Sequence, residues 1–173
     1  MSFKISWKLH INCFLIGFTF CLMGQNYINN LILNLLLENK IIKFTGNPLL
    51  NFIFFIFIIF IAIIFFHELL HGATYKIFGT KVKYGFKIIY AYVQETSGIA
   101  LHRTKFLIVL LAPVTIISIA SIFIAGSIGD IIFLLNLLGS IGDLLMAFYL
   151  CKSNENSYII DTKYGFDVVM KID

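Results

Sequence analysis

Two histidines and a glutamate stand together in "FFHELLHGATYKIFG", residues 65–79, directly after a long apolar run. Positions four apart in a helix lie one above the other, so His67 and His71 present two imidazoles to a single ion. Glu68 is then within reach of a water on that ion and can act as its general base. Zinc lowers the pKa of such a water to about 7, and a carboxylate takes the proton as the water attacks a carbonyl. The pattern therefore predicts a hydrolytic zinc site.

A catalytic zinc takes three protein ligands and keeps one position open, so another part of the chain must supply the third. Asp143 is the first candidate, in "NLLGSIGDLLMAFYL" at residues 136–150. An ionised aspartate inside an apolar span costs about 2.5–3.5 kcal/mol, which a bound cation would offset. Small or polar residues three, four and seven positions earlier would share its helical face: Ser140, Gly139 and Asn136. The alternative is ordinary small-residue helix packing, with Asp143 paired to a hydroxyl or a lysine.

Three other residues compete with Asp143 for the third position. The sequence "GSIGD" occurs twice, at 126–130 and 139–143, and Asp130 ends the first copy. That copy lies between two apolar runs and is typical of a tight external turn, where Asp130 would form the turn or cap a helix, far from the histidines. His102 and Glu95 lie in the polar segment that follows the histidines, which we expect on the same side of a membrane as the histidines. Both are more typical of exposed polar residues.

Apolar residues dominate the 173-residue chain: 60% are hydrophobic, 13% are charged, and 19 are Phe. Several apolar runs reach the roughly 20 residues that a membrane helix needs. We therefore expect an integral membrane protein with one domain, residues 1–173, and four spans, the first interrupted by polar residues and retained rather than cleaved as a signal peptide. The expected spans lie near 11–36, 49–70, 106–125 and 131–150.

The basic residues orient these spans. Four crossings put the N-terminus, the 71–105 segment and the C-terminal tail on one side. Of the thirteen basic residues, only Lys40 and Lys43 would lie on the other side. The positive-inside rule therefore predicts cytosolic N- and C-termini. The basic residues are scattered rather than arranged in a stripe, so the net charge of +4 does not indicate nucleic-acid binding. The eleven basic residues on the cytosolic side are Lys4, Lys8, Lys76, Lys81, Lys83, Lys87, Arg103, Lys105, Lys152, Lys163 and Lys171.

Both polar stretches have the composition of strands. "KVKYGFKIIYAYVQETSG", residues 81–98, is rich in Tyr, Val and Ile, and "SYIIDTKYGFDVVMKI", residues 157–172, resembles two short strands around "TKYG". The expected fold class is an all-α membrane protein of about four transmembrane helices with short cytosolic β-strand segments. A helix over about residues 49–78 would be about 45 Å long, so its last turns would leave the ~30 Å hydrocarbon core near His67 and His71. In a simpler interpretation these polar residues are only the cytosolic end of that helix.

Several motifs together resemble the putative zincin peptidases, a family of small bacterial multi-pass membrane proteins distantly similar to site-2 proteases. In chain order they are "HELLHG", "KYGFK", "AYV", "LLAP", "NLLGSIGDL" and "DTKYGF". The resemblance implies that His67, His71 and Asp143 bind zinc, that Glu68 is the catalytic base, and that the protein lies in a bacterial cell membrane. In site-2 proteases a glycine usually follows the distal aspartate, whereas Leu144 follows Asp143 here.

The sequence thus predicts a zinc-dependent intramembrane metallopeptidase that hydrolyses peptide bonds of a membrane protein or peptide near the cytosolic face. An extended substrate segment could pair with the strands near 81–97. The alternative is a metal-binding scaffold, sensor or transporter component without turnover. Glu68 discriminates between the two classes, because a scaffold needs the metal ligands but has no need of a base.

Overall fold

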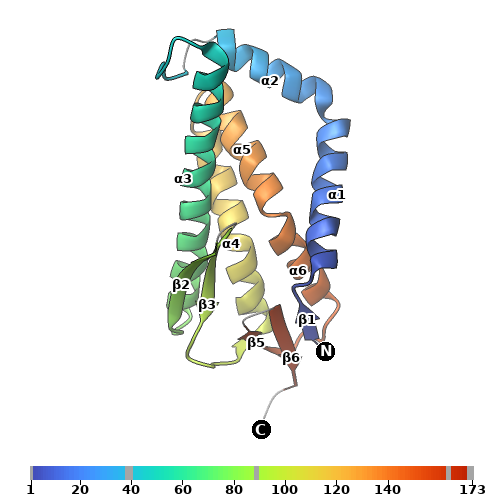
Figure 1. Ribbon diagram of the computed structural model, residues 1–173. Coiled ribbons are helices and arrows are strands. Elements are labelled where there is room, and N and C mark those ends of the chain that lie inside the picture. Colours follow the sequence, from blue (N-terminus) through green and yellow to red (C-terminus); the bar gives the residue numbers. More distant parts are fainter. Residues whose placement is uncertain (1, 38–40, 88–89, 163–164, 171–173) are drawn as a thin grey trace.

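The computed structural model of the chain describes residues 2–37, 41–87, 90–162 and 165–170. In these ranges the long helices lie side by side, and the strands gather at one end of them (Figure 1). The helices are α1 (Trp7–Met23), α2 (Gln25–Leu37), α3 (Pro48–Ile77), α4 (Arg103–Ile122), α5 (Ser127–Gly139) and α6 (Ile141–Cys151). The strands are β1 (Ser2–Lys4), β2 (Val82–Lys87), β3 (Tyr90–Glu95), β4 (Leu101–His102), β5 (Tyr158–Thr162) and β6 (Gly165–Val169).

Helix α3 carries the H-E-x-x-H pattern, and local sequence sets where it begins. The Asn47 side chain accepts hydrogen bonds from the N–H groups of Leu49 and Leu50, at 2.9 and 3.4 Å. Pro48 occupies the first turn, where its missing N–H has no helical partner in any case. The helix then runs for 30 residues and ends beside Gly79, whose φ of +82° favours glycine. Its length places the histidines near the strand end of the molecule.

Only α3 and α4 are each long and apolar enough to cross a membrane within the described part of the chain. The segment expected as a first span is divided at Gly24 into α1 and α2, bent by 75°, where the polar sequence "GQNYINN" begins. The last expected span is likewise divided at Ser140 into α5 and α6, bent by 51°. The candidate spans therefore number two, or four if each bent pair counts as one.

Two small antiparallel sheets make the all-α fold class only partly right. One sheet has the order β1-β6-β5-β4, and β2 pairs with β3 in the other. The strands expected in residues 81–98 and 157–172 are confirmed as β2, β3, β5 and β6. β1 and β4 were not expected, because three and two residues are too short to show an alternating pattern. Lys163 and Tyr164, in the expected "TKYG" turn, lie outside the described residues, as do Lys40 and Lys171.

Apolar packing is concentrated in two clusters that lie along α3 on either side of the histidines. The first joins α3, α4, α6 and the larger sheet and includes Tyr75, Phe106, Leu150 and Phe166. The second joins α2, α3 and α5. Its buried members are Leu31, Leu35, Phe55 and Ile131. Because α3 and its neighbours are fixed above and below the histidines, side chains between the two clusters are held in defined positions.

Candidate metal centre

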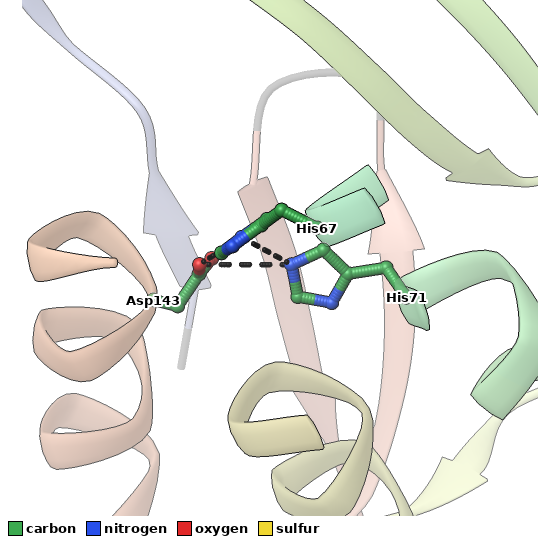
Figure 2. Close-up of side chains that lie close together, drawn as sticks. All are labelled: His67, His71 and Asp143. Carbon is green, nitrogen blue, oxygen red and sulfur yellow. Dashed lines mark hydrogen bonds and ion pairs between the residues drawn. The ribbon is translucent and has the colours of Figure 1, made fainter. Parts of the chain in front are cut away.

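His67 and His71 of α3 and Asp143 of α6 point toward one another (Figure 2). His67 Nε2 lies 2.9 Å from Asp143 Oδ2, and His71 Nε2 lies 3.1 Å from His67 Nε2. The third side of the triangle, His71 Nε2 to Asp143 Oδ2, measures 3.6 Å. The His67 and Asp143 side chains are only 12% and 14% exposed. Two helices distant in sequence thus bring three ligand-type atoms to one point.

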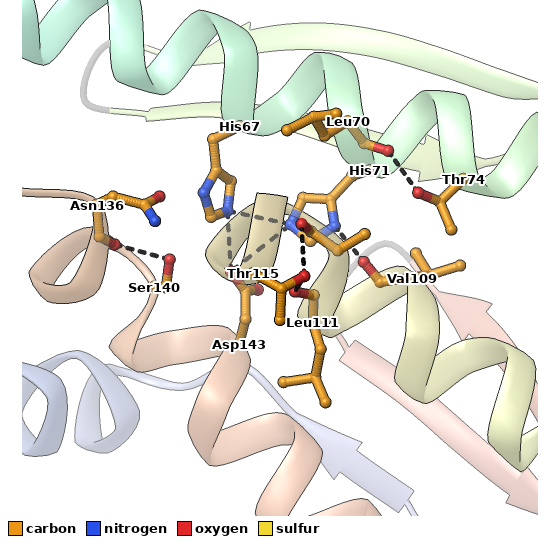
Figure 3. A network of polar contacts seen from close by, with 11 residues as sticks. His67, Leu70, His71, Thr74, Val109, Leu111, Thr115, Asn136, Ser140 and Asp143 are labelled. Carbon is orange, nitrogen blue, oxygen red and sulfur yellow. Dashed lines mark hydrogen bonds and ion pairs between the residues drawn. The ribbon is translucent and has the colours of Figure 1, made fainter. Parts of the chain in front are cut away.

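The bend between α5 and α6 directs Asp143 toward α3. Asn136 at the end of α5 donates from Nδ2 to the Val114 carbonyl and to Ser118 Oγ of α4, at 3.2 and 3.1 Å. Ser140 Oγ donates to the Asn136 carbonyl at 2.7 Å, and α6 begins at the next residue (Figure 3). Asp143 therefore lies in the first turn of α6. The continuous helical face expected from Asn136 to Asp143 does not exist, because the bend interrupts it.

The three atoms fit a zinc ion. Zinc bonds of about 2.0–2.2 Å to imidazole nitrogen and carboxylate oxygen, in tetrahedral geometry, separate neighbouring ligand atoms by about 3.3 Å. The observed separations of 2.9, 3.1 and 3.6 Å bracket that value. Two imidazoles and one carboxylate are also a ligand set of known catalytic zinc sites, and they leave a fourth position open. His67, His71 and Asp143 are therefore placed so that they could hold a metal ion.

The second ring nitrogen of His71 has a defined partner. Nδ1 lies 2.8 Å from the backbone carbonyl oxygen of Val109 in α4. A carbonyl oxygen only accepts, so Nδ1 carries the proton and the neutral ring keeps a lone pair on Nε2, the atom that faces His67 and Asp143. This hydrogen bond selects the tautomer that can bind a metal. Val109 could not be expected from the sequence, because it contributes a backbone atom, which its side-chain type does not reveal.

Glu68 follows the first histidine on α3 and lies between strand β3 and the cluster formed by His67, His71 and Asp143. Its side chain is half-buried, and the backbone N–H of Val93 on β3 points toward its carboxylate. The β2–β3 hairpin sits close against α3, where Tyr84 occupies the space that a side chain at Gly72 would need. A Cβ at Gly72 would lie 2.1 Å from the Tyr84 hydroxyl oxygen. The glycine after the second histidine thus lets the hairpin reach Glu68.

The competing candidates for the third ligand lie elsewhere. Asp130 is exposed in the first turn of α5, and the rest of that helix, residues 131–139 or about 14 Å, lies between it and the bend that leads to Asp143. His102 caps the start of α4 by accepting from the Thr104 N–H at 3.3 Å. Glu95 is buried and accepts from the N–H groups of Ser97 and Gly98, at 2.6 and 2.9 Å. Metal binding by His67, His71 and Asp143 and catalysis by Glu68 stay predictions.

A second polar group lies next to the strand end of α3. Asp161 of β5 accepts a hydrogen bond from the Glu95 N–H at 3.0 Å and another from the Tyr75 side chain. Burial raises the pKa of the Asp161 carboxyl to about 6, and the negative charge of Glu95 acts in the same direction. At the outer edge of β3, the Glu95 N–H thus donates to the Asp161 carboxylate, and the Val93 N–H faces the Glu68 carboxylate.

Fold and site together define a mostly helical protein with apolar candidate spans and a candidate two-histidine, one-aspartate metal centre. Comparison with protein families agrees with this class: a family model described as "Putative zincin peptidase" matches residues 58–158. Because that match covers more than half of the chain, the protein belongs to this family of metallopeptidase type. No curated protein and no solved structure matches the chain. The similarity to site-2 proteases stays a prediction.

Proposed function

We propose that this protein is a zinc metallopeptidase that hydrolyses peptide bonds of a membrane-associated protein. The observation that carries the proposal is the convergence of His67, His71 and Asp143 within 3.6 Å of one another, beside Glu68, in a chain of the zincin peptidase family. The same three residues would bind the zinc ion. Of the two classes of protein predicted from the sequence, a hydrolase is favoured over a metal-binding scaffold, because the Glu68 carboxylate adjoins the proposed ligands.

Each residue has a separate role in the proposed reaction. His67, His71 and Asp143 bind and orient the ion, and the single carboxylate offsets half of its charge. When bound, zinc lowers the pKa of a water to about 7 and polarises a carbonyl. A carboxylate oxygen of Glu68 takes the proton from the attacking water and returns it to the leaving amine. The surrounding apolar packing keeps bulk solvent from the reacting atoms.

The bilayer would surround the helices, with α3 and α4 crossing it. Exposed apolar side chains cover the outside of α3, including Phe54, Phe57, Phe65 and Phe66, which would contact lipid acyl chains. The strands lie together at one end of the helices (Figure 1), and the positive-inside rule, applied to the eleven basic residues, supports a cytosolic location for that end. The proposed site would then face substrate near the cytosolic membrane boundary.

An extended segment of the substrate would dock along the outer edge of β3. β2 pairs with only one side of β3, and the Glu95 N–H is directed to the other side, where it meets Asp161. Val93 lies two residues earlier, so its N–H points the same way, toward Glu68. A peptide that paired with this edge would run directly past the proposed base. Strand addition of this kind exposes backbone carbonyls that a helical substrate hides.

Cleavage of a partly unfolded membrane peptide by the purified protein tests the proposed function. We expect wild-type protein with zinc to cleave it, and Glu68→Gln or a chelator to stop cleavage. Val93→Pro, which removes the edge N–H, should lower the rate at least tenfold if substrate docks on β3. The Val93 N–H faces away from β2, so proline at this position leaves the β2 pairing intact, and unchanged cleavage by Val93→Pro would disprove edge docking without affecting the peptidase assignment.

A further inference from the structure

We infer that Pro113 is a positioning residue of the metal centre: by lacking an N–H group, it leaves the Val109 carbonyl free to orient His71. The inference rests on the proposed zinc site. Pro113 lies within α4, is fully buried, and is not one of the residues that supply the three ligand-type atoms. Its effect would be transmitted through one backbone oxygen.

The spacing of four positions between Val109 and Pro113 is that of a hydrogen bond in an α-helix. In an α-helix the carbonyl of residue i accepts from the N–H of residue i+4, so the expected donor for Val109 is residue 113. Proline has no N–H, and its ring also pushes the carbonyl four residues earlier away from the helix axis. The Val109 oxygen instead accepts from His71 Nδ1 at 2.8 Å. A side chain of α3 thus replaces the missing donor of α4, and Figure 3 shows the contact between His71 and Val109.

A buried proline inside a helix needs a compensating reason. Proline in a helix interior is less favourable than alanine by about 3 kcal/mol, because it removes one hydrogen bond and crowds the preceding turn. Here that lost bond is replaced by a contact that holds an imidazole. His71 is only 9% exposed, so few other partners are available to its Nδ1. The proline therefore couples the course of α4 to the orientation of a ring on α3.

Orientation of this ring decides which nitrogen can bind a metal. With Nδ1 donating to Val109, the lone pair of Nε2 faces His67 Nε2 and Asp143 Oδ2, at 3.1 and 3.6 Å. An N–H at position 113 would compete for the Val109 oxygen, and the ring could then adopt the other tautomer or rotate. Loss of an outer hydrogen bond to a ligand typically weakens metal binding 10–100-fold. The same change would restore a backbone hydrogen bond within α4.

Zinc affinity of Pro113→Ala, measured by chelator competition on full-length protein in detergent, tests the inference. We expect affinity 10–100-fold below wild type. The control is Pro48→Ala, since Pro48 is the other proline, lies at the start of α3 about five turns before His67, and should leave affinity within about twofold. Nitrogen NMR of histidine-labelled, metal-free protein should show the Nδ1–H tautomer of His71 in wild type and a mixture in Pro113→Ala. Equal affinity and an unchanged tautomer in Pro113→Ala would overturn the inference.

An ester at position 113 separates the missing N–H from the shape of the proline ring. Inserting the α-hydroxy analogue of alanine there removes the N–H without a ring, and it should restore zinc affinity to within about threefold of wild type. Affinity as low as that of Pro113→Ala would assign the effect to the ring and overturn the inference. If wild-type protein binds no zinc, the proposed function fails, whereas the His71 tautomer still tests the role of Pro113 separately.

Discussion

His67 and Asp143 lie 76 positions apart in the sequence, yet His67 Nε2 and Asp143 Oδ2 are 2.9 Å apart. This contact joins α3 to α6 through polar atoms in a largely apolar region. A histidine and a carboxylate so placed can share a proton or bind a cation, and His71 Nε2 at 3.1 Å from His67 adds a third ligand-type atom. The contact therefore identifies the residues whose replacement should most affect metal binding.

Replacing Asp143 should remove zinc, whereas replacing Asp130 should not. We expect about one zinc per wild-type chain and loss of most of it in Asp143→Ala, because one of the three proposed ligands is gone. Asp143→Asn keeps the shape but not the charge and should also bind zinc weakly. Asp130→Ala is the matched control from the repeated "GSIGD". It should keep the metal and lose only about 0.3–1 kcal/mol from the first turn of α5. Zinc content at equal folded yield would measure this, and stoichiometric zinc in Asp143→Ala would contradict the site.

Glu68→Gln should retain zinc and abolish hydrolysis. The substitution keeps the size of the side chain and removes only its ability to take a proton, while His67, His71 and Asp143 remain. Paired measurements of zinc content and peptide cleavage would separate metal binding from turnover. Wild-type turnover in Glu68→Gln would rule out Glu68 as the base. In cells, a scaffold would still function with this substitution, whereas a peptidase would lose its product fragments.

Gly72→Ala should displace the hairpin from α3. The added Cβ would lie 2.1 Å from the Tyr84 hydroxyl oxygen, so Tyr84 must move and stability should fall by about 1–3 kcal/mol. Adding Tyr84→Leu should recover part of that loss, because the clashing atoms are removed, and a double-mutant cycle would measure the coupling. Gly139→Ala is the control, since, among the described residues and apart from the adjoining backbone of its own helix, no atom lies within 4 Å of its Cβ position. Thermal unfolding in detergent gives the comparison, and equal losses in both variants would contradict the contact.

Protonation of Asp161 should make stability depend on pH. Burial raises the pKa of its carboxyl from 3.8 to about 6 in the folded state. The folded protein thus holds this proton more tightly, so the stabilisation is fully present below about pH 4 and is lost as the pH rises through 6. Relative to Asp161→Asn, the wild-type free energy of unfolding should fall by about 2–3 kcal/mol between pH 4 and 7.

The control for Asp161 is Asp167→Asn, an exposed position on the neighbouring strand β6. It should follow the wild-type pH dependence. Unfolding curves at several pH values would show the difference, and identical slopes for wild type and Asp161→Asn would contradict the raised pKa of Asp161.

Reporter fusions should place both termini in the cytosol. With four spans, eleven basic residues would fall on the side of the termini and two, Lys40 and Lys43, on the other. A reporter active only in the cytosol should therefore work at residue 173 and fail at residue 41. A reporter active only outside the cytosol should give the opposite pattern. An external C-terminus would mean that one of the bent pairs, α1–α2 or α5–α6, does not cross the bilayer.

By itself the sequence determined the features that depend on neighbouring residues. Helical spacing puts His67 and His71 on one face, and that follows from 3.6 residues per turn alone. The alternating, β-branched and aromatic residues of 82–87, 90–95, 158–162 and 165–169 were sufficient to predict β2, β3, β5 and β6. These properties are local, so packing did not need to be known.

Only the tertiary structure decided the bends and the partners of the site. The cost of an unpaired aspartate inside an apolar span favoured Asp143 as the third ligand, and the structure brings it to the histidines, although its role as a ligand stays a prediction. The bend at Ser140 depends on hydrogen bonds from Asn136 to α4, which no local pattern encodes. The partner of His71, the Val109 carbonyl, is a backbone atom on another helix. Such contacts form between segments distant in the chain, and their geometry is fixed only when α3, α4 and α6 pack together.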